Sequence, residues 1–176
     1  MDKILVYGTS DGGSNLSRVT LNKNKVMVFR KLSTREEVDL LPYAHDFLTE
    51  HPEHKLYVGT DSQNIGNFTV YATVIVFHNT NGGGHVLYSK VSLPKIADRW
   101  TRLWKEVEMS VETANILKGG DFPLVDFIDL DLNPDPRYKS NMVLRSAVGY
   151  VESFGYKARV KPNATIASCV ADSIFR

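Results

Sequence analysis

The chain lacks several features that would place it in a specialised class. It has one cysteine among 176 residues, so it can form neither an internal disulfide nor a cysteine-rich zinc cluster. Its 21 lysines and arginines nearly balance its 20 aspartates and glutamates, and a net charge of +1 gives no global attraction for nucleic acid or membranes. No apolar run is long enough to span a bilayer, and the start MDKILVYG lacks a signal-like pattern. We therefore expect a cytoplasmic protein with no membrane partner.

The composition is that of an ordinary globular domain. Hydrophobic residues make up 43% of the chain and charged residues 23%, and no long polar tract suggests disorder. A chain of this length suits one domain with a substantial core. We expect a single domain over residues 1–176, with an N-terminal extension over 1–50 and a core over 55–176.

The N-terminal extension is predicted to hold strands and one helix. Residues 4–7 and 26–29 are typical of a strand pair or hairpin, with a turn at residues 11–13. The sequence Ser33-Thr34-Arg35-Glu36 has the form of a capping box, which predicts a helix from there to Thr49. His51-Pro52 is expected to end that helix.

The core pattern changes from strands to alternating helices and strands. Three antiparallel strands are predicted at 56–60, 68–77 and 85–91, and the middle one is apolar enough to be buried on both faces. They are followed by a helix from Pro94 to Gly119, a strand at 124–132, a helix at 140–154, a strand at 156–160 and a helix at 164–175. This order predicts an α/β fold with a mixed five-stranded sheet flanked by helices.

Six acidic residues fall where a side chain can reach the end of this sheet. They are Asp61 after the first core strand, Glu106 and Glu108 on the next helix, Asp129 and Asp131 on the fourth core strand, and Asp172 on the last helix. Aspartates at neighbouring strand ends repel each other unless a cation lies between them. Oxygen ligands suit Mg²⁺ or Mn²⁺, so the pattern predicts a site for two such ions.

Spacing alone leaves two choices open. Period-two alternation points Asp129 and Asp131 to the same side of their strand, so either is a candidate ligand. Glu106 and Glu108 flank Val107 on opposite edges of the apolar helix face, and geometry does not choose between them.

The chain contains, in this order, LYVGTDSQ, FTVYATVIVFH, RLWKEVEMSVETA, FIDLDLN and VKPNATIASCVADSIF. Together these stretches resemble the YkuK family of the ribonuclease H-like superfamily, over most of the chain from about Ser33 onward. The resemblance implies a ribonuclease H-like fold and a quartet of metal-binding, catalytic carboxylates, which it assigns to Asp61, Glu106, Asp131 and Asp172. Asp129 falls where the family pattern is not necessarily acidic, and it stays an alternative or supporting ligand.

These residues predict a metal-dependent nuclease that hydrolyses phosphodiester bonds, with two Mg²⁺ or Mn²⁺ ions as cofactors. Its partner is expected to be RNA, DNA or a hybrid. The expected nucleic-acid contacts are the basic residues Lys161, Arg159 and Arg102, together with Gln63.

Two other functions compete with this prediction. A catalytically silent module that binds nucleic acid or protein is disfavoured by the retention of all four acids, although the near-neutral charge argues against strong non-specific duplex binding. A phosphotransferase on the same scaffold is disfavoured because the chain has no evident nucleotide loop. The five histidines lack zinc-motif spacing and are interpreted as surface residues, and Cys169 as a small core residue.

Overall fold

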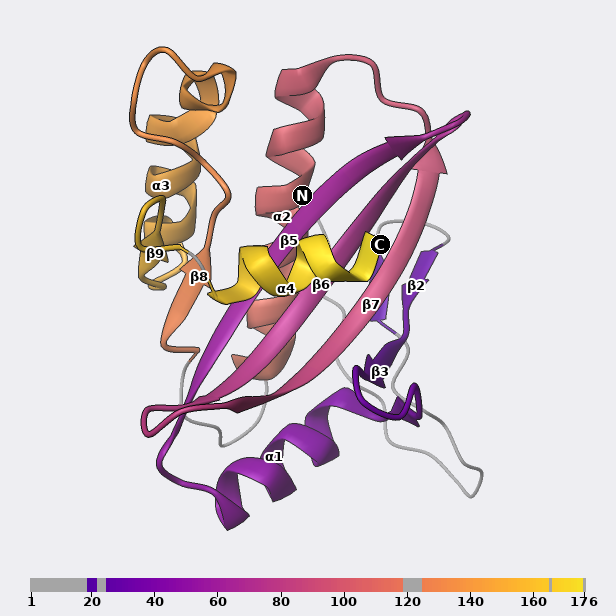
Figure 1. Ribbon diagram of the computed structural model, residues 1–176, viewed down its shortest axis with the longest axis vertical. Helices are drawn as coiled ribbons and strands as arrows, with labels where there is room; N and C mark the ends of the chain where they lie inside the picture. The colour runs from indigo at the N-terminus through magenta and orange to yellow at the C-terminus, as the bar shows by residue number, and fades with distance from the viewer. Residues whose placement is uncertain (1–18, 22–24, 119–124, 165, 176) are drawn as a thin grey trace, which may run out of the picture.

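The computed structural model describes residues 19–21, 25–118, 125–164 and 166–175 and shows a seven-stranded sheet with helices on both faces (Figure 1). The strand order in this sheet is β4-β3-β7-β6-β5-β8-β9. Within the described ranges, the strands β1 (Val19–Leu21) and β2 (Lys25–Met27) form a separate two-stranded sheet.

Three long strands form the centre of the sheet. They are β5 (His54–Ile65), β6 (Phe68–Asn79) and β7 (Gly84–Pro94), and each pairs antiparallel with the next. Residues 71–77 of β6 are all buried, which confirms the prediction of a middle strand covered on both faces. The β-branched and aromatic residues of β6 fit this position because they pack well on a pleated surface.

Two short parallel strands complete the predicted five-stranded core. They are β8 (Phe127–Asp129), which pairs with β5, and β9 (Ala158–Arg159), which pairs with β8. The helix α2 (Arg99–Lys118) connects β7 to β8, and η1 (Lys139–Val143) with α3 (Leu144–Ser153) connects β8 to β9. The last helix is α4 (Ile166–Phe175).

Alternating residues of the strands divide the core into two layers. Leu56 and Val58 face a large cluster with buried residues of α1 (Leu40–Glu50), α2 and α3, whereas Tyr57 faces a smaller cluster with Ala171 of α4. Figure 1 shows α4 crossing the sheet on the near side, with α2 behind it. The two faces of β5 therefore meet different helices, so successive residues of this strand lie against different helices.

The predicted capping box is wrong. Residues 33–36 form the turn between β3 (Phe29–Lys31) and β4 (Glu37–Val38), and the helix α1 (Leu40–Glu50) begins only after Asp39. Strand pairing outweighs the local helix signal because the hairpin joins the edge of the main sheet next to β7. The predicted end of the helix at His51-Pro52 is confirmed.

The helix α2 starts later than predicted. Pro94 ends β7 instead of opening a helix, and Asp98 accepts a hydrogen bond of 2.7 Å from the backbone N–H of Thr101, as an N-cap residue does. The predicted hairpin strand at 4–7 and the stop at Gly119 lie outside the described residues. Within the described part of the chain, no helix has the length and apolar character needed to cross a membrane.

Candidate active site

Asp61 lies inside a strand and does not close it as predicted. The strand β5 continues to Ile65, and Asp61 pairs with Ala72 of β6. On the other side of β5, pairing with β8 stops at Gly59 opposite Asp129. The polar residues after Asp61 remain in strand geometry because they extend the β5–β6 hairpin. A prediction based on runs of apolar residues ends the strand too early. Asp61 therefore belongs to the part of β5 that reaches beyond β8.

Asp61 and Asp131 occupy equivalent places on adjacent segments. Each lies two residues after the last pair between β5 and β8, which joins Gly59 and Asp129. Parallel strands that are paired directly lie about 4.8 Å apart. Asp61 and Asp131 therefore both lie just beyond the same end of the β5–β8 pairing.

Glu106 brings a third carboxylate to the same region from α2. Its side chain is buried, with 5% of the residue exposed, and its Oε1 accepts a hydrogen bond of 2.5 Å from Oγ of Ser62. Ser110, one turn further along α2, donates a hydrogen bond of 2.9 Å to Oγ1 of Thr60. These hydroxyl groups attach the Glu106 segment of α2 to the strand that carries Asp61.

The surroundings of Glu106 raise its pKa well above the ordinary value. Burial is the largest cause, the Ser62 hydrogen bond opposes it, and the negative charges of Asp61 and Asp131 raise the pKa further, while Arg102 lowers it. The three carboxylates thus share one electrostatic environment. A divalent cation bound there would relieve the repulsion between them.

Glu108, the other candidate on α2, has a different partner. Its Oε2 lies 3.0 Å from Nζ of Lys105, and its side chain is about one-third exposed, at 34%. Glu106, by contrast, faces Ser62 of β5. The structure therefore brings Glu106, and not Glu108, to the acids of the sheet.

Asp129 is paired with an arginine. Its side chain is fully buried, and it accepts hydrogen bonds of 2.7 and 2.9 Å from Nε and Nη2 of Arg159. The guanidinium group also lies 4.3 Å from the ring centre of Tyr57 and 4.8 Å from that of Phe127. Asp129 and Arg159 thus form a buried pair on the α4 side of the sheet. The predicted contact of Arg159 with nucleic acid would use the same guanidinium group that binds Asp129.

Lys161 makes a similar contact with the other aspartate of this segment. Its Nζ lies 2.5 Å from Oδ1 of Asp131, and its side chain is half-exposed. Arg159 and Lys161 thus each lie against an aspartate of the segment that contains Asp129 and Asp131. Of the other predicted contacts, Arg102 lies close enough to Glu106 to lower its pKa, and Gln63 is an exposed residue of β5 opposite Val70.

The fourth predicted ligand is only partly described. Asp172 belongs to α4, but its side chain lies outside the described part of the structure, as does that of Cys169. The helix itself contacts β5, β6 and β8, and Ala171 is buried in its interface with the sheet. The helix that carries Asp172 therefore covers the face of β5 to which Asp61 belongs.

The donor chemistry of this site suits a hard cation. Carboxylate oxygens are the ligands that Mg²⁺ and Mn²⁺ prefer, and Mg²⁺ keeps several waters when few protein groups bind it. Among the described side chains, Asp61, Glu106 and Asp131 do not form a group whose ligand atoms all lie within 4.8 Å of one another. The carboxylate oxygens of these three acids therefore lie farther apart than the ligand atoms around a single ion.

A hollow at the start of α2 joins Arg99, a basic residue that the sequence suggested for phosphate contact, to residues that sequence reasoning missed. Its volume is about 480 Å³, and it is lined by Arg99, Pro136, Tyr138, Lys139, Asn141 and Met142. Tyr138 and Met142 are large side chains that remain more than half exposed. The start of α2 and the loop before α3 lie at the same end of the molecule in Figure 1. The only sequence signal was an aromatic and a basic residue within a proline-rich loop.

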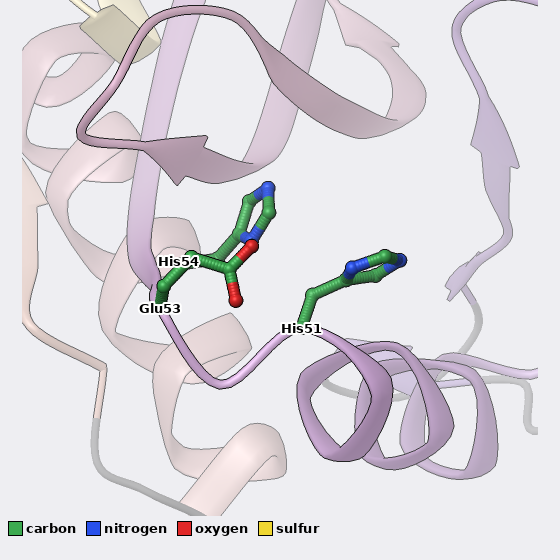
Figure 2. A group of neighbouring side chains, drawn as sticks. All are labelled: His51, Glu53 and His54. Carbon is green, nitrogen blue, oxygen red and sulfur yellow. The ribbon is translucent and has the colours of Figure 1, made fainter.

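The histidines are not all surface residues, contrary to the sequence interpretation. Only 9% of the His54 side chain is exposed, and burial is the main reason that the pKa of His85 is lowered. His51, Glu53 and His54 present ligand atoms that all lie within 4.8 Å of one another (Figure 2). In the sequence, these ligands lie within the four residues His-Pro-Glu-His. This spacing does not match a zinc motif, so the sequence pattern did not identify them.

The fold is a mixed α/β sheet flanked by helices, with interacting acids on β5, on α2 and after β8. A family model described as "Ribonuclease H-like" matches residues 42–176. The chain therefore belongs to the Ribonuclease H-like family, in agreement with the predicted fold. Neither the curated proteins nor the solved structures gave a match.

Proposed function

We propose that the protein is a metal-dependent nuclease that hydrolyses phosphodiester bonds in nucleic acid in the cytoplasm, and that it is a YkuK-like member of its family. The observation that carries this proposal is the buried Glu106 carboxylate of α2, which Ser62 binds next to Asp61 of β5. The negative charges of Asp61 and Asp131 contribute to its raised pKa. Acids gathered from separate elements and partly buried are typical of a functional site, because folding alone disfavours them.

The proposed ligands are Asp61, Glu106, Asp131 and Asp172, and the cofactors are two Mg²⁺ or Mn²⁺ ions. When bound, the ions supply activation of the attacking water and stabilisation of the leaving oxygen. As a ligand, Glu106 would release to the solvent the proton that its raised pKa favours in the metal-free protein. Ser62 then holds the ionised carboxylate in place through its hydroxyl group, and Arg102 offsets part of the negative charge.

Lys161 and Arg159 have separate roles in this proposal. The half-exposed ammonium group of Lys161 lies beside Asp131, where it can also contact a phosphate oxygen of the substrate. Arg159 fixes the direction of the segment after β8 by neutralising Asp129. Asp129 then supports the site without binding metal.

The hollow at the start of α2 supports binding of an unpaired strand. Arg99 and Lys139 offer positive charge for phosphates, and the exposed ring of Tyr138 offers a face on which a base can stack. Along α2, Arg99 precedes Glu106 by seven residues, which spans about 10 Å. That distance places the hollow within a few nucleotides of the proposed point of cleavage.

The test compares cleavage of labelled single-stranded, duplex, hybrid and branched substrates in Mg²⁺ or Mn²⁺. Asp61→Asn and Glu106→Gln are expected to lose cleavage, and the matched variant Glu108→Gln is expected to keep it. No metal-dependent cleavage of any substrate by the parent protein, or equal cleavage by Asp61→Asn, would refute the proposal. Binding without cleavage would favour the silent binding module.

A further inference from the structure

Three potential metal ligands meet where α1 ends and β5 begins. His51 caps the C-terminal end of α1, Glu53 lies in the turn that follows, and His54 is the first residue of β5. Their ligand atoms all lie within 4.8 Å of one another, and Figure 2 shows the Glu53 carboxylate and the two rings facing a common space. We propose that these three residues form a site for Zn²⁺ or a similar late first-row divalent cation, separate from the carboxylate cluster.

A buried nitrogen atom supports this proposal independently of the clustering. Nδ1 of His54 is inaccessible to solvent and makes no hydrogen bond of acceptable geometry, although it lies 3.1 Å from Oε1 of Glu53. Buried polar atoms of native proteins nearly always have a partner, because leaving one without a partner costs free energy. A cation held between Glu53 and His54 gives the imidazole that partner.

The backbone and packing hold the cluster in position before any ion binds. The N–H of His51 donates a 2.9 Å hydrogen bond to the carbonyl of Phe47, and the N–H of His54 donates one of 3.2 Å to the carbonyl of His51. The Phe47 ring contacts both imidazoles, with ring centres 4.7 Å and 5.3 Å away. The two imidazoles therefore lose little conformational freedom when a metal binds, which favours affinity.

The ligand set decides which metal the site takes. Two imidazoles and one carboxylate match the nitrogen-rich sets of zinc sites, and water can complete four-coordination. Mg²⁺ prefers oxygen ligands, as in the carboxylate cluster. His54 precedes Asp61 by seven residues of the same strand, which separates the two sites by about 23 Å. The two sites can therefore be occupied and tested independently.

The position of the site indicates what a bound ion does. The ligands join the end of α1 to the start of β5, which pairs along its whole length with β6. A metal here ties the helix to the central strand and stabilises the folded state, because the unfolded chain does not hold the three ligands in one fixed arrangement. The expected role is therefore structural.

The experiment titrates the full, chelator-treated protein with Zn²⁺ by calorimetry in excess Mg²⁺. We expect one Zn²⁺ per chain, a higher melting temperature on binding, and, with Co²⁺, the absorption bands of tetrahedral coordination. His51→Ala and Glu53→Gln change residues away from the core and are expected to weaken Zn²⁺ binding by more than about tenfold. His45→Ala, which removes an exposed histidine of α1 outside the cluster, is the matched control.

Two results would overturn the proposal. One is the absence of saturable Zn²⁺ binding by the parent protein, and the other is unchanged affinity in both His51→Ala and Glu53→Gln. Asp61→Asn should bind Zn²⁺ with unchanged affinity, so this measurement is independent of whether the protein is a nuclease.

Discussion

Ser62 on β5 donates a hydrogen bond of 2.5 Å to the buried carboxylate of Glu106 on α2. Successive residues of a strand point to opposite faces, so Asp61 belongs to the α4 side and Ser62 to the α2 side. One dipeptide therefore supplies an acid from the strand and fixes a second acid from a helix. The ionisation of Glu106 and the attachment of α2 to β5 both depend on this link.

Glu106→Gln is expected to stabilise the metal-free protein at neutral pH. Above the ordinary carboxyl pKa of 4.5, the unfolded chain releases a proton that folded Glu106 retains, so stability falls as pH rises toward the raised pKa. A difference of one pKa unit between the folded and unfolded states corresponds to about 1.4 kcal/mol. Melting temperatures measured in chelator from acid to neutral pH should decline less in the variant. Glu108→Gln is the control, and an equal decline in Glu106→Gln and the parent would contradict the prediction.

Ser62→Ala is expected to move the acid limb of metal-dependent cleavage to higher pH. Removing the hydroxyl group takes away the hydrogen bond that lowers the pKa of Glu106, so ionisation requires a higher pH. A hydrogen bond to a charged group is worth about 1.5 to 3 kcal/mol, which corresponds to a displacement of the limb by about one to two pH units. The measurement is the pH profile of kcat/KM at saturating Mg²⁺.

Ser110→Ala controls for the loss of a buried hydroxyl group from the same interface. Its hydroxyl bonds to Thr60 and to the backbone carbonyl of Glu106, not to the carboxylate. The profile of Ser110→Ala should therefore match that of the parent. A displacement of equal size in both variants would show that packing, and not the carboxylate contact, sets the pH dependence.

Breaking the buried pair between Asp129 and Arg159 is expected to destabilise the fold strongly. Arg159→Met leaves the Asp129 carboxylate buried without its cation, which typically costs about 3 to 5 kcal/mol. The double variant Asp129→Asn with Arg159→Met should recover part of that loss in urea denaturation. Arg137→Met, which breaks the exposed pair with Asp135, should leave the midpoint unchanged. Equal midpoints for Arg159→Met and Arg137→Met would contradict the prediction.

Lys161→Met is expected to change metal affinity and catalysis in opposite directions. Its ammonium group lies at Oδ1 of Asp131, so removing the charge makes that oxygen more available to Mg²⁺. Half-maximal activity should be reached at lower Mg²⁺ concentration, while kcat/KM at saturation falls because a phosphate contact is lost. Lys139→Met, which changes a residue of the hollow at the start of α2, should leave the Mg²⁺ requirement unchanged. A higher Mg²⁺ requirement in Lys161→Met would contradict the prediction that Lys161 competes with Mg²⁺ for Asp131.

The local pattern predicted the elements of the core better than those of the extension. The β6 strand has a long run of β-branched and aromatic residues, the helix before Gly155 has apolar residues at helical spacing, and both are present at nearly the predicted bounds. Gly155 has a φ of 83°, the left-handed conformation that ends many helices. The segment around Ser33 was mispredicted because its local signals favour a helix, whereas pairing of Phe29 with Val38 favours a hairpin.

The sequence by itself determined the fold class and the candidate acids, because hydrophobic periodicity and residue chemistry are local properties. It could not decide how charges are paired. Arg159 and Lys161, expected to face nucleic acid, lie against Asp129 and Asp131. Glu106 is distinguished from Glu108 by the strand that its side chain meets. These choices depend on the register between distant segments, which only the tertiary structure establishes, because burial and pairing arise when helices and strands pack together.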